Sequence, residues 1–426
     1  MSITRRGLLA GSTALAAASR AAQASPTEIP KVTVISQWST GSYLRAMNML
    51  GQMFTDAGGQ WTATPVPGFT TDMMNKLRAD IIAGNPPAVA QLKGPEIAEW
   101  SKIAPTVQLD DVVSKADYEN KLPEVLVRLH KPFGHWIALP LHAYRINTLY
   151  ASRKAMDKVG ATKLPATWAE FNDLAVKMKA AGIVPLSHGG LPYYDAMYFE
   201  IVLAGISPGT YRRALMGLDN DALRGPEMLA AFRQLRKMTT WMDPANAGQS
   251  WIVFTQNIMR GEHGMLLMGT WAQGVYANVG FKPDVDYMVG PAPSDVPEPA
   301  FDLNADAFIF WKRPEPEYEL GQKLLAAIVM GKPFETAFTQ IIGSIPVRTD
   351  MDLSAPGFTD SQREQAAAFA AAVKGDRVVL SLGHNMAQPN RITAAMLDVF
   401  AEFVHNPDMT PEDGQRQLAD AADTVR

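Results

Sequence analysis

Strands and helices alternate along the first hundred residues, and this alternation restricts the fold more than any other feature of the sequence. β-branched and apolar residues predict strands over 31–38, 60–66 and 88–92. Apolar residues at helical spacing predict helices over 43–54 and 72–82. This alternation is typical of a parallel sheet with helices on both faces. The sequence therefore predicts an α/β fold.

The same alternation starts again further along the chain. The predicted strands are 135–144, interrupted by Pro140, and then 183–187, 264–268 and 306–311. The main predicted helices are 168–180, 226–242, 249–259, 361–372, 391–405 and 411–422. Two α/β units predict two lobes around a cleft. The lobes are expected to be discontinuous, because the second unit begins before the first is complete.

The N-terminus has the pattern of an export signal. Arg5 and Arg6 directly precede a short apolar segment, and Ala22 and Ala24 provide the small residues of a cleavage site. Residues 1–24 are therefore predicted to be a signal peptide of the twin-arginine type. Without them the formal net charge falls from −4 to −7, because three arginines and no acidic residue are removed. An exported protein with this charge is not expected to bind nucleic acid.

Composition and motifs exclude several kinds of chemistry. The chain has no cysteine, so a disulfide, a thiol nucleophile and a lipid attached to cysteine are all excluded. The nucleophile-elbow, zinc-protease, P-loop and EF-hand motifs are absent from the sequence, and the seven histidines are scattered. We therefore expect no catalytic residue, no metal and no cofactor.

Aromatic residues beside polar ones point to a binding site. Trp38, Trp251 and Trp271 lie at predicted strand ends or helix starts, next to serine, threonine or glutamine. Lys93 follows a predicted strand, and ligands bind beyond the carboxyl ends of strands in such sheets. A sugar presents an apolar face to aromatic rings and a rim of hydroxyls to polar groups. This pattern indicates a carbohydrate site.

Several blocks of sequence, in order, resemble the extracellular solute-binding proteins of ABC importers for sugars, and in particular the glucose/mannose-binding branch. They are AGNPPAVAQLKGPEIAEW (83–100), GHWIALPLHAYRINTLY (134–150), PLSHGGLPYYDAMYFE (185–200), LDNDALRGPEM (218–228), GMLLMGTWAQG (264–274), GSIPVRTD (343–350) and LGHNMA (382–387). The resemblance covers nearly the whole chain after residue 24.

The resemblance implies a two-lobe periplasmic-binding-protein fold, type II-like, with three hinge crossings near 140–144, 291–293 and 344–347. The lobes would close around a ligand at these hinges. The implied division is an N-terminal lobe of 25–141 plus 291–345 and a C-terminal lobe of 142–290 plus 346–426.

The resemblance also implies the residues that contact the sugar. They are Trp38, Lys93, Trp251, Trp271, Asp306 and His384. The tryptophans would stack on the sugar, and Lys93 and Asp306 would hold its hydroxyls. Gln37, Tyr144 and Tyr193 stand where the branch usually has tryptophan, histidine and tryptophan. We therefore expect glucose to bind more weakly than the physiological ligand, which would be a sugar derivative, a polyol or a short oligosaccharide.

The expected function is the periplasmic substrate-binding component of an ABC importer. The protein would be a soluble monomer without a lipid anchor, and it would pass its ligand to the permease transmembrane subunits without changing it. Two alternatives remain open at this point. One is an exported carbohydrate-active enzyme, and the other is a binding protein that presents its ligand to a chemosensory receptor.

Overall fold

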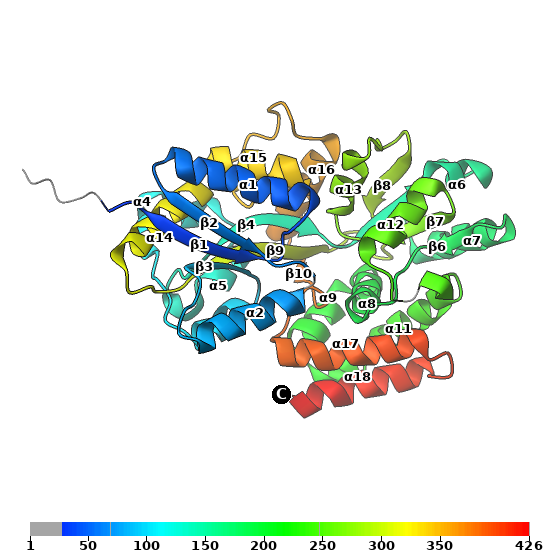
Figure 1. The fold of residues 1–426 in the computed structure, drawn as a ribbon. Helices are drawn as coiled ribbons and strands as arrows, with labels where there is room; N and C mark the ends of the chain where they lie inside the picture. The colour runs from blue at the N-terminus through cyan, green and yellow to red at the C-terminus, as the bar shows by residue number, and fades with distance from the viewer. Residues whose placement is uncertain (1–27, 69, 247, 426) are drawn as a thin grey trace, which may run out of the picture.

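A computed structural model describes residues 28–68, 70–246 and 248–425, which form two lobes with one β-sheet each (Figure 1). The predicted signal peptide, residues 1–24, lies outside the described residues. The strands are β1 (Lys31–Ser36), β2 (Gln60–Pro65), β3 (Val89–Leu92), β4 (Ala138–Arg145), β5 (Thr148–Ser152), β6 (Val184–Leu186), β7 (His263–Leu267), β8 (Tyr287–Pro291), β9 (Phe301–Phe310) and β10 (Val378–Leu380).

The helices lie between these strands and at the end of the chain. In the first half they are α1 (Gly41–Asp56), α2 (Thr70–Ile82), α3 (Glu96–Ser101), α4 (Asp110–Lys115), α5 (Glu124–His130), α6 (Arg153–Lys158), α7 (Trp168–Ala180), α8 (Pro192–Ile206) and α9 (Pro208–Tyr211). In the second half they are α10 (Asn220–Leu223), α11 (Pro226–Thr239), α12 (Trp251–Arg260), α13 (Ala272–Asn278), α14 (Pro316–Val329), α15 (Lys332–Ile342), α16 (Asp360–Lys374), α17 (Asn390–His405) and α18 (Pro411–Val425).

The first lobe is built on a sheet with the strand order β10-β9-β3-β1-β2, in which β4 also pairs with β9. β1 is parallel to β2 and β3, whereas β9 is antiparallel to both β3 and β4. The prediction of a wholly parallel sheet is therefore wrong. The reason is that β9 comes from the second lobe and enters this sheet at the edge where β3 ends. It therefore runs in the direction opposite to β3.

Helices cover both faces of the first sheet. Figure 1 shows α1 and α15 above it and α2 below it. Side chains of β1 alternate between the two faces, as a strand requires. Val32 and Val34 belong to the core beneath α1, α14 and α15, whereas Ile35 belongs to the core that Leu77 of α2 and Trp100 of α3 complete.

The second lobe is built on the sheet β6-β7-β5-β8, around the buried helix α8. Helices α11 and α17 pack against α8, and α18 packs against both of them. β5, β8 and α8 were not among the predicted elements. For α8 the reason is physical, because residues 194–205 are all buried and a helix that is apolar all round has no periodic pattern.

The chain crosses between the two sheets three times. The crossings run from Arg145 to Thr148, from Pro291 to Phe301, and from the end of β10 to the start of α17. The second agrees with a predicted hinge position. The other two differ: residues 140–144 lie within β4, and Ile345 pairs with Ala143 of that strand.

The sheets therefore group two segments differently from the predicted lobe boundaries. All of β4 and the later strand β10 belong to the first sheet, and α16 packs on β9 and β10. The predicted C-terminal segment 346–426 is thus shared, with α17 and α18 in the second lobe. The reason is that β10 pairs in parallel with β9, which returns the chain to the first sheet after residue 346.

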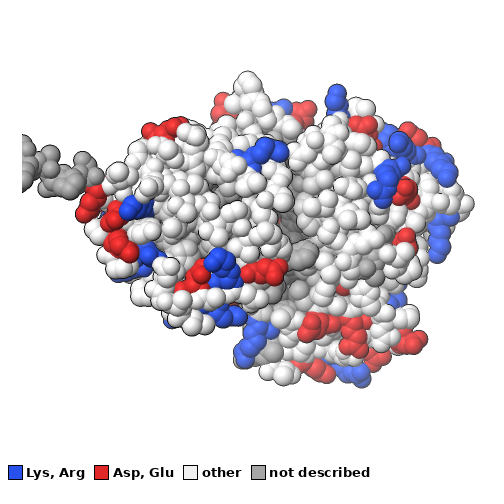
Figure 2. All heavy atoms as spheres, viewed as in Figure 1, with Lys and Arg blue, Asp and Glu red and all other residues white. Residues whose placement is uncertain are grey.

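Two surface properties bear on where the protein acts. In the described part of the chain, no helix combines the length and the apolar character needed to cross a bilayer. On the face shown in Figure 2, basic and acidic side chains are interspersed over both lobes.

Candidate functional site

A buried polar cluster surrounds Asp306, near the point where β3 ends. Gln91 of β3 donates from Nε2 to Asp306 Oδ1 at 3.0 Å, and Lys93 Nζ lies 3.9 Å from the same oxygen. His142 Nε2 lies 3.3 Å from Oδ2. Burial alone would raise the pKa of Asp306, but Lys93, His142 and Gln91 together hold that pKa well below its usual range. Asp306 is therefore an ionised acceptor for hydrogen-bond donors.

Pro140 explains why His142 faces this carboxylate. The sequence predicts a strand that Pro140 interrupts, but β4 continues through it. The pairing of β4 with β9 shifts register between Pro140 and His142, as expected where proline has no N–H to donate. After the shift His142 stands directly opposite Asp306.

A row of aromatic side chains leads from this cluster to the second lobe. The ring centroids of Trp38 and His142 are 5.7 Å apart, and those of His142 and Tyr144 are 4.6 Å apart. Tyr144 lies 5.5 Å from Trp271, just before α13, and Trp271 lies 5.0 Å from His384. Both lobes and the third crossing therefore contribute to one continuous row.

The other predicted site residues lie at varying distances from this row. The backbone N–H of Gln37 donates to Gln91 Oε1 at 3.1 Å, which places it beside the Asp306 cluster. The ring of Tyr193, near the start of α8, lies 6.3 Å from that of His384. Trp251 is the first residue of α12, and within residues 28–68, 70–246 and 248–425 no ring contact joins it to the row. The sugar-contacting roles of all these residues remain predictions.

Burial separates Trp38 from Trp271. Trp38 is only 5% exposed and belongs to the core of the first lobe. Its ring stacks on Tyr43 at 5.4 Å and lies 5.6 Å from Phe338. Trp271 is half-buried. In this conformation Trp271 is therefore the more accessible platform for a ligand.

His384 is held by residues that the sequence analysis did not identify. Its Nδ1 lies 2.9 Å from Ser381 Oγ, and that hydroxyl donates to Glu200 Oε1 at 2.7 Å. Glu200 Oε2 also accepts from the backbone N–H groups of Leu382 and Gly383, at 2.6 and 3.0 Å. Burial, together with nearby Lys93, lowers the pKa of His384 to about 3. The imidazole is therefore neutral at physiological pH.

The signal for Glu200 was present in the sequence. It is the only charged residue in the apolar run 196–206, and a buried carboxylate requires partners. One partner, Tyr211, is 11 residues away, but Ser381, Leu382 and Gly383 lie in a segment 181 or more residues away, so their identity could not be inferred from local pattern.

Gly94 brings the end of β3 against the third crossing. Its φ of +52° lies in the left-handed region that favours glycine. A Cβ at this position would lie 2.5 Å from the carbonyl oxygen of Asn385 and 2.8 Å from Met386 Cα. This close approach holds Lys93 and Glu96 next to the segment that carries His384.

A small pocket of about 10 Å³ opens beside this cluster. It is lined by Gln37, Met73, Met74, Gln91, Leu92, Lys93, Glu96 and Asp306. Ligand pockets usually measure about 300–1,000 Å³. A sugar would therefore fit here only if the lobes or the lining side chains moved apart.

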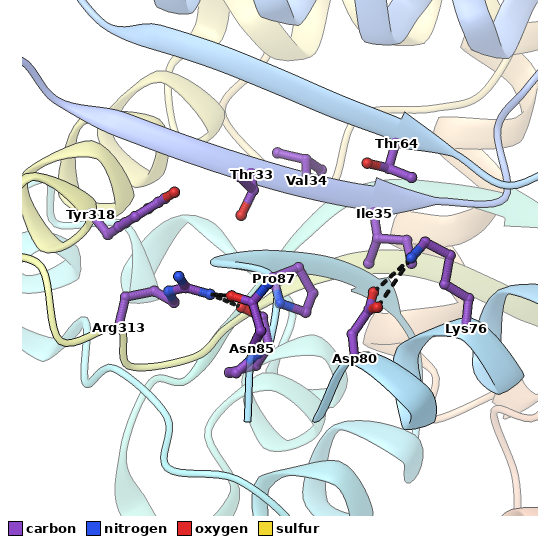
Figure 3. A pocket seen from close by; sticks show the side chains of 11 residues that line it. Thr33, Val34, Ile35, Thr64, Lys76, Asp80, Asn85, Pro87, Arg313 and Tyr318 are labelled. Atoms are coloured by element: carbon purple, nitrogen blue, oxygen red, sulfur yellow. Dashed lines mark hydrogen bonds and ion pairs between the residues drawn. The ribbon is translucent and has the colours of Figure 1, made fainter. Parts of the chain in front are cut away.

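A larger pocket of about 390 Å³ lies elsewhere in the first lobe (Figure 3). It is lined by Thr33, Val34, Ile35, Thr64, Lys76, Asp80, Asn85, Pro86, Pro87, Arg313 and Tyr318. Pro86 and Pro87 precede β3, whereas Lys93 follows it, so the two pockets lie at opposite ends of that strand. The cationic groups of this larger pocket already have partners, since Lys76 pairs with Asp80 and Arg313 donates to Asn85.

The arrangement around Asp306 suits the binding of a ligand rich in hydroxyl groups. An ionised carboxylate, an ammonium group and two amides can exchange hydrogen bonds with neighbouring hydroxyls, while the rings offer apolar faces. The described residues contain no group of three or more histidine, aspartate or glutamate side chains that could hold a metal ion.

Comparison with known proteins identifies the family of this chain. The family described as "Bacterial extracellular solute-binding protein" matches residues 50–379. A Brucella suis protein named "Probable sugar-binding periplasmic protein" is 32% identical over 404 residues, which cover 95% of this chain and 94% of that protein.

Solved structures with low sequence identity share the fold. The bacterial solute receptor AcbH, whose title states a preference for β-D-galactopyranose, has a TM-score of 0.73 at 18% identity and covers 93% of this chain and 99% of its own. Maltose-bound T. maritima MalE3 has a TM-score of 0.72 at 16% identity, and it covers 93% of this chain and 100% of its own. These similarities confirm the predicted two-lobe α/β fold. The protein belongs to the bacterial extracellular solute-binding protein family.

Proposed function

We propose that this protein captures a carbohydrate between its two lobes, in the periplasm, and delivers it to the transmembrane subunits of an ABC importer. The observation that carries the proposal is the Asp306 cluster at one end of a row of rings that spans both lobes. Such a site matches both faces of a sugar, because the rings contact its C–H face and the polar groups contact its hydroxyls.

The names of related proteins support the carbohydrate class. The Brucella suis relative is named as sugar-binding and periplasmic, and the two solved structures bind a galactopyranose and maltose according to their titles. We propose that this protein, too, is exported by its signal peptide, remains monomeric without a lipid anchor, and releases its ligand unchanged.

A calorimetric panel tests the carbohydrate proposal directly. We expect at least one neutral sugar, sugar derivative, polyol or short oligosaccharide to bind with a Kd in the micromolar range or below. Glucose should bind about tenfold to hundredfold more weakly than the best ligand, because Thr270 stands where the branch that this sequence resembles usually has aspartate, and a missing charged partner costs about 1.5–3 kcal/mol. Native mass spectrometry of protein purified without refolding identifies any ligand that is carried along.

Two outcomes would contradict the proposal. One is a panel in which no carbohydrate or polyol binds while a co-purified molecule of another class does. The other is recovery of a chemically altered sugar after incubation, which would favour the alternative of an exported carbohydrate-active enzyme.

Hinge motion is the second expected result. The small volume of the pocket beside Asp306 requires the lobes or the lining side chains to move apart before a sugar enters, and the three crossings limit where the backbone can bend. A ligand that contacts both lobes binds the closed form better and shifts the population toward it. Small-angle scattering should therefore show a smaller radius of gyration with saturating ligand than without it. An unchanged radius at saturation would count against hinge closure.

A further inference from the structure

Glu96 is a second carboxyl group in the small pocket beside Asp306. It is the first residue of α3, it is 1% exposed, and it lines this pocket together with Lys93 and Asp306. Its Oε1 accepts a hydrogen bond from Asn385 Nδ2 at 3.3 Å. Its Oε2 is buried and has no hydrogen-bond partner in the part of the chain that the structure describes.

The charges around this pocket balance only while Glu96 is protonated. Lys93 is the one cation among its lining residues, and its ammonium lies 3.9 Å from the ionised Asp306. His384, from the third crossing, is neutral and adds no positive charge. Burial raises the pKa of Glu96 to about 7, while Lys93, Asn390 and Asn385 lower it only in part. A buried carboxylate without full compensation is costly, so this position favours an incoming donor.

We propose that Glu96 is a specificity-determining residue that contacts the bound carbohydrate and selects an amino sugar over its neutral and acidic analogues. This inference rests on the proposed function. An ammonium group would give Oε2 a hydrogen bond and would supply the missing positive charge, whereas a hydroxyl would supply only the hydrogen bond. A carboxylate on the sugar would add a negative charge beside Asp306 and Glu96 in a pocket with one lysine.

The test compares D-glucose with two sugars that each differ from it in one group, D-glucosamine and D-glucuronate. The same comparison is made in the galactose series. Calorimetry at pH 6 should show glucosamine or galactosamine binding at least about tenfold more tightly than its neutral analogue, and the acidic sugar weakest. Titration in two buffers of different ionisation enthalpy should show proton release approaching one per amino sugar bound, because the ammonium displaces the proton of Glu96.

Variants locate this selectivity at Glu96. Glu96→Gln should lose the preference for the amino sugar and the proton release. Glu99→Gln, on the same short helix, should retain both properties and serves as the matched control. If Glu96→Gln does not fold, Glu96→Asp keeps the charge and should retain the ranking with weaker binding.

Each other outcome contradicts either the role of Glu96 or the proposed function. An acidic sugar that binds as tightly as its amino analogue, or an unchanged ranking in Glu96→Gln, overturns the role of Glu96. Binding of other carbohydrates but none of these six sugars also overturns it and leaves the proposed function standing. Failure of every carbohydrate overturns the proposed function itself.

Discussion

Replacing Trp38 with alanine is expected to destabilise the first lobe by about 3–5 kcal/mol, in addition to any effect on ligand binding. The indole is 5% exposed and packs among Tyr43, His142 and Phe338. Removing it would leave a cavity that these rings cannot fill without moving. It would also remove one of the three ring neighbours of His142, which are Trp38, Tyr144 and Phe338.

Urea unfolding followed by circular dichroism measures this effect without depending on the removed fluorophore. Trp271→Ala is the matched control, because Trp271 is half-buried and should cost less stability while it still weakens binding. A Trp38→Ala variant with an unchanged unfolding midpoint and a lost affinity would show that this ring serves the ligand and contributes little to the core.

Trp38 also shows what sequence reasoning can and cannot reach. Its position at the end of a strand was predictable, because the run of β-branched residues before it is a strong local signal. Its burial was not, because the rings around it come from a helix, from β4 and from α15. Local pattern predicts the secondary structure of a segment, whereas the burial of a side chain depends on partners far away in the sequence.

The accuracy of predicted elements follows the same rule. The helix predicted over 168–180 agrees with α7 at both ends, and its start has a local cause, since the Thr167 hydroxyl accepts from the N–H of Glu170. β9 was predicted only from Asp306 onward. Its first half contains Asp302 and Asn304, polar residues that become buried where the strand joins both lobes.

For the binding site, residue types were more predictable than partners. Lys93 was named from its place after a predicted strand and Asp306 from the resemblance to a family, and the structure brings them within 3.9 Å of each other. Gln91 and Glu96 flank Lys93 in the sequence, yet no local pattern distinguishes them from other polar residues. Their importance follows from burial in one small pocket, which only the folded chain defines.

Replacing Glu200 with alanine is expected to cost about 2–4 kcal/mol of stability and to weaken ligand binding as well. The carboxylate accepts from Ser381 and from the backbone N–H groups of Leu382 and Gly383, and Tyr211 donates to it at 3.1 Å. Without it these buried donors lose their partner, and His384 loses the support of the segment that holds it. Glu200→Gln keeps the shape and one acceptor oxygen, so its loss should be smaller.

The pH dependence of stability separates the charge of Glu200 from its shape. Burial raises the pKa of Glu200 from 4.5 to about 7, and burial raises the pKa of nearby Asp302 as well. Between pH 4.5 and about pH 7, Glu200 keeps its proton in the folded protein but has released it in the unfolded chain. Stability therefore falls as the pH rises through this range. The contribution of Glu200 is on the order of 2–3 kcal/mol.

Urea midpoints at pH 5 and pH 8 measure this contribution. The wild type should lose more stability between pH 5 and pH 8 than Glu200→Gln does, because the glutamine of the variant cannot ionise. Glu364→Gln, an exposed position on α16, should behave as the wild type does. An equal fall in the wild type and in Glu200→Gln would show that Glu200 is ionised in the folded protein at both pH values, with its four donors compensating fully for burial.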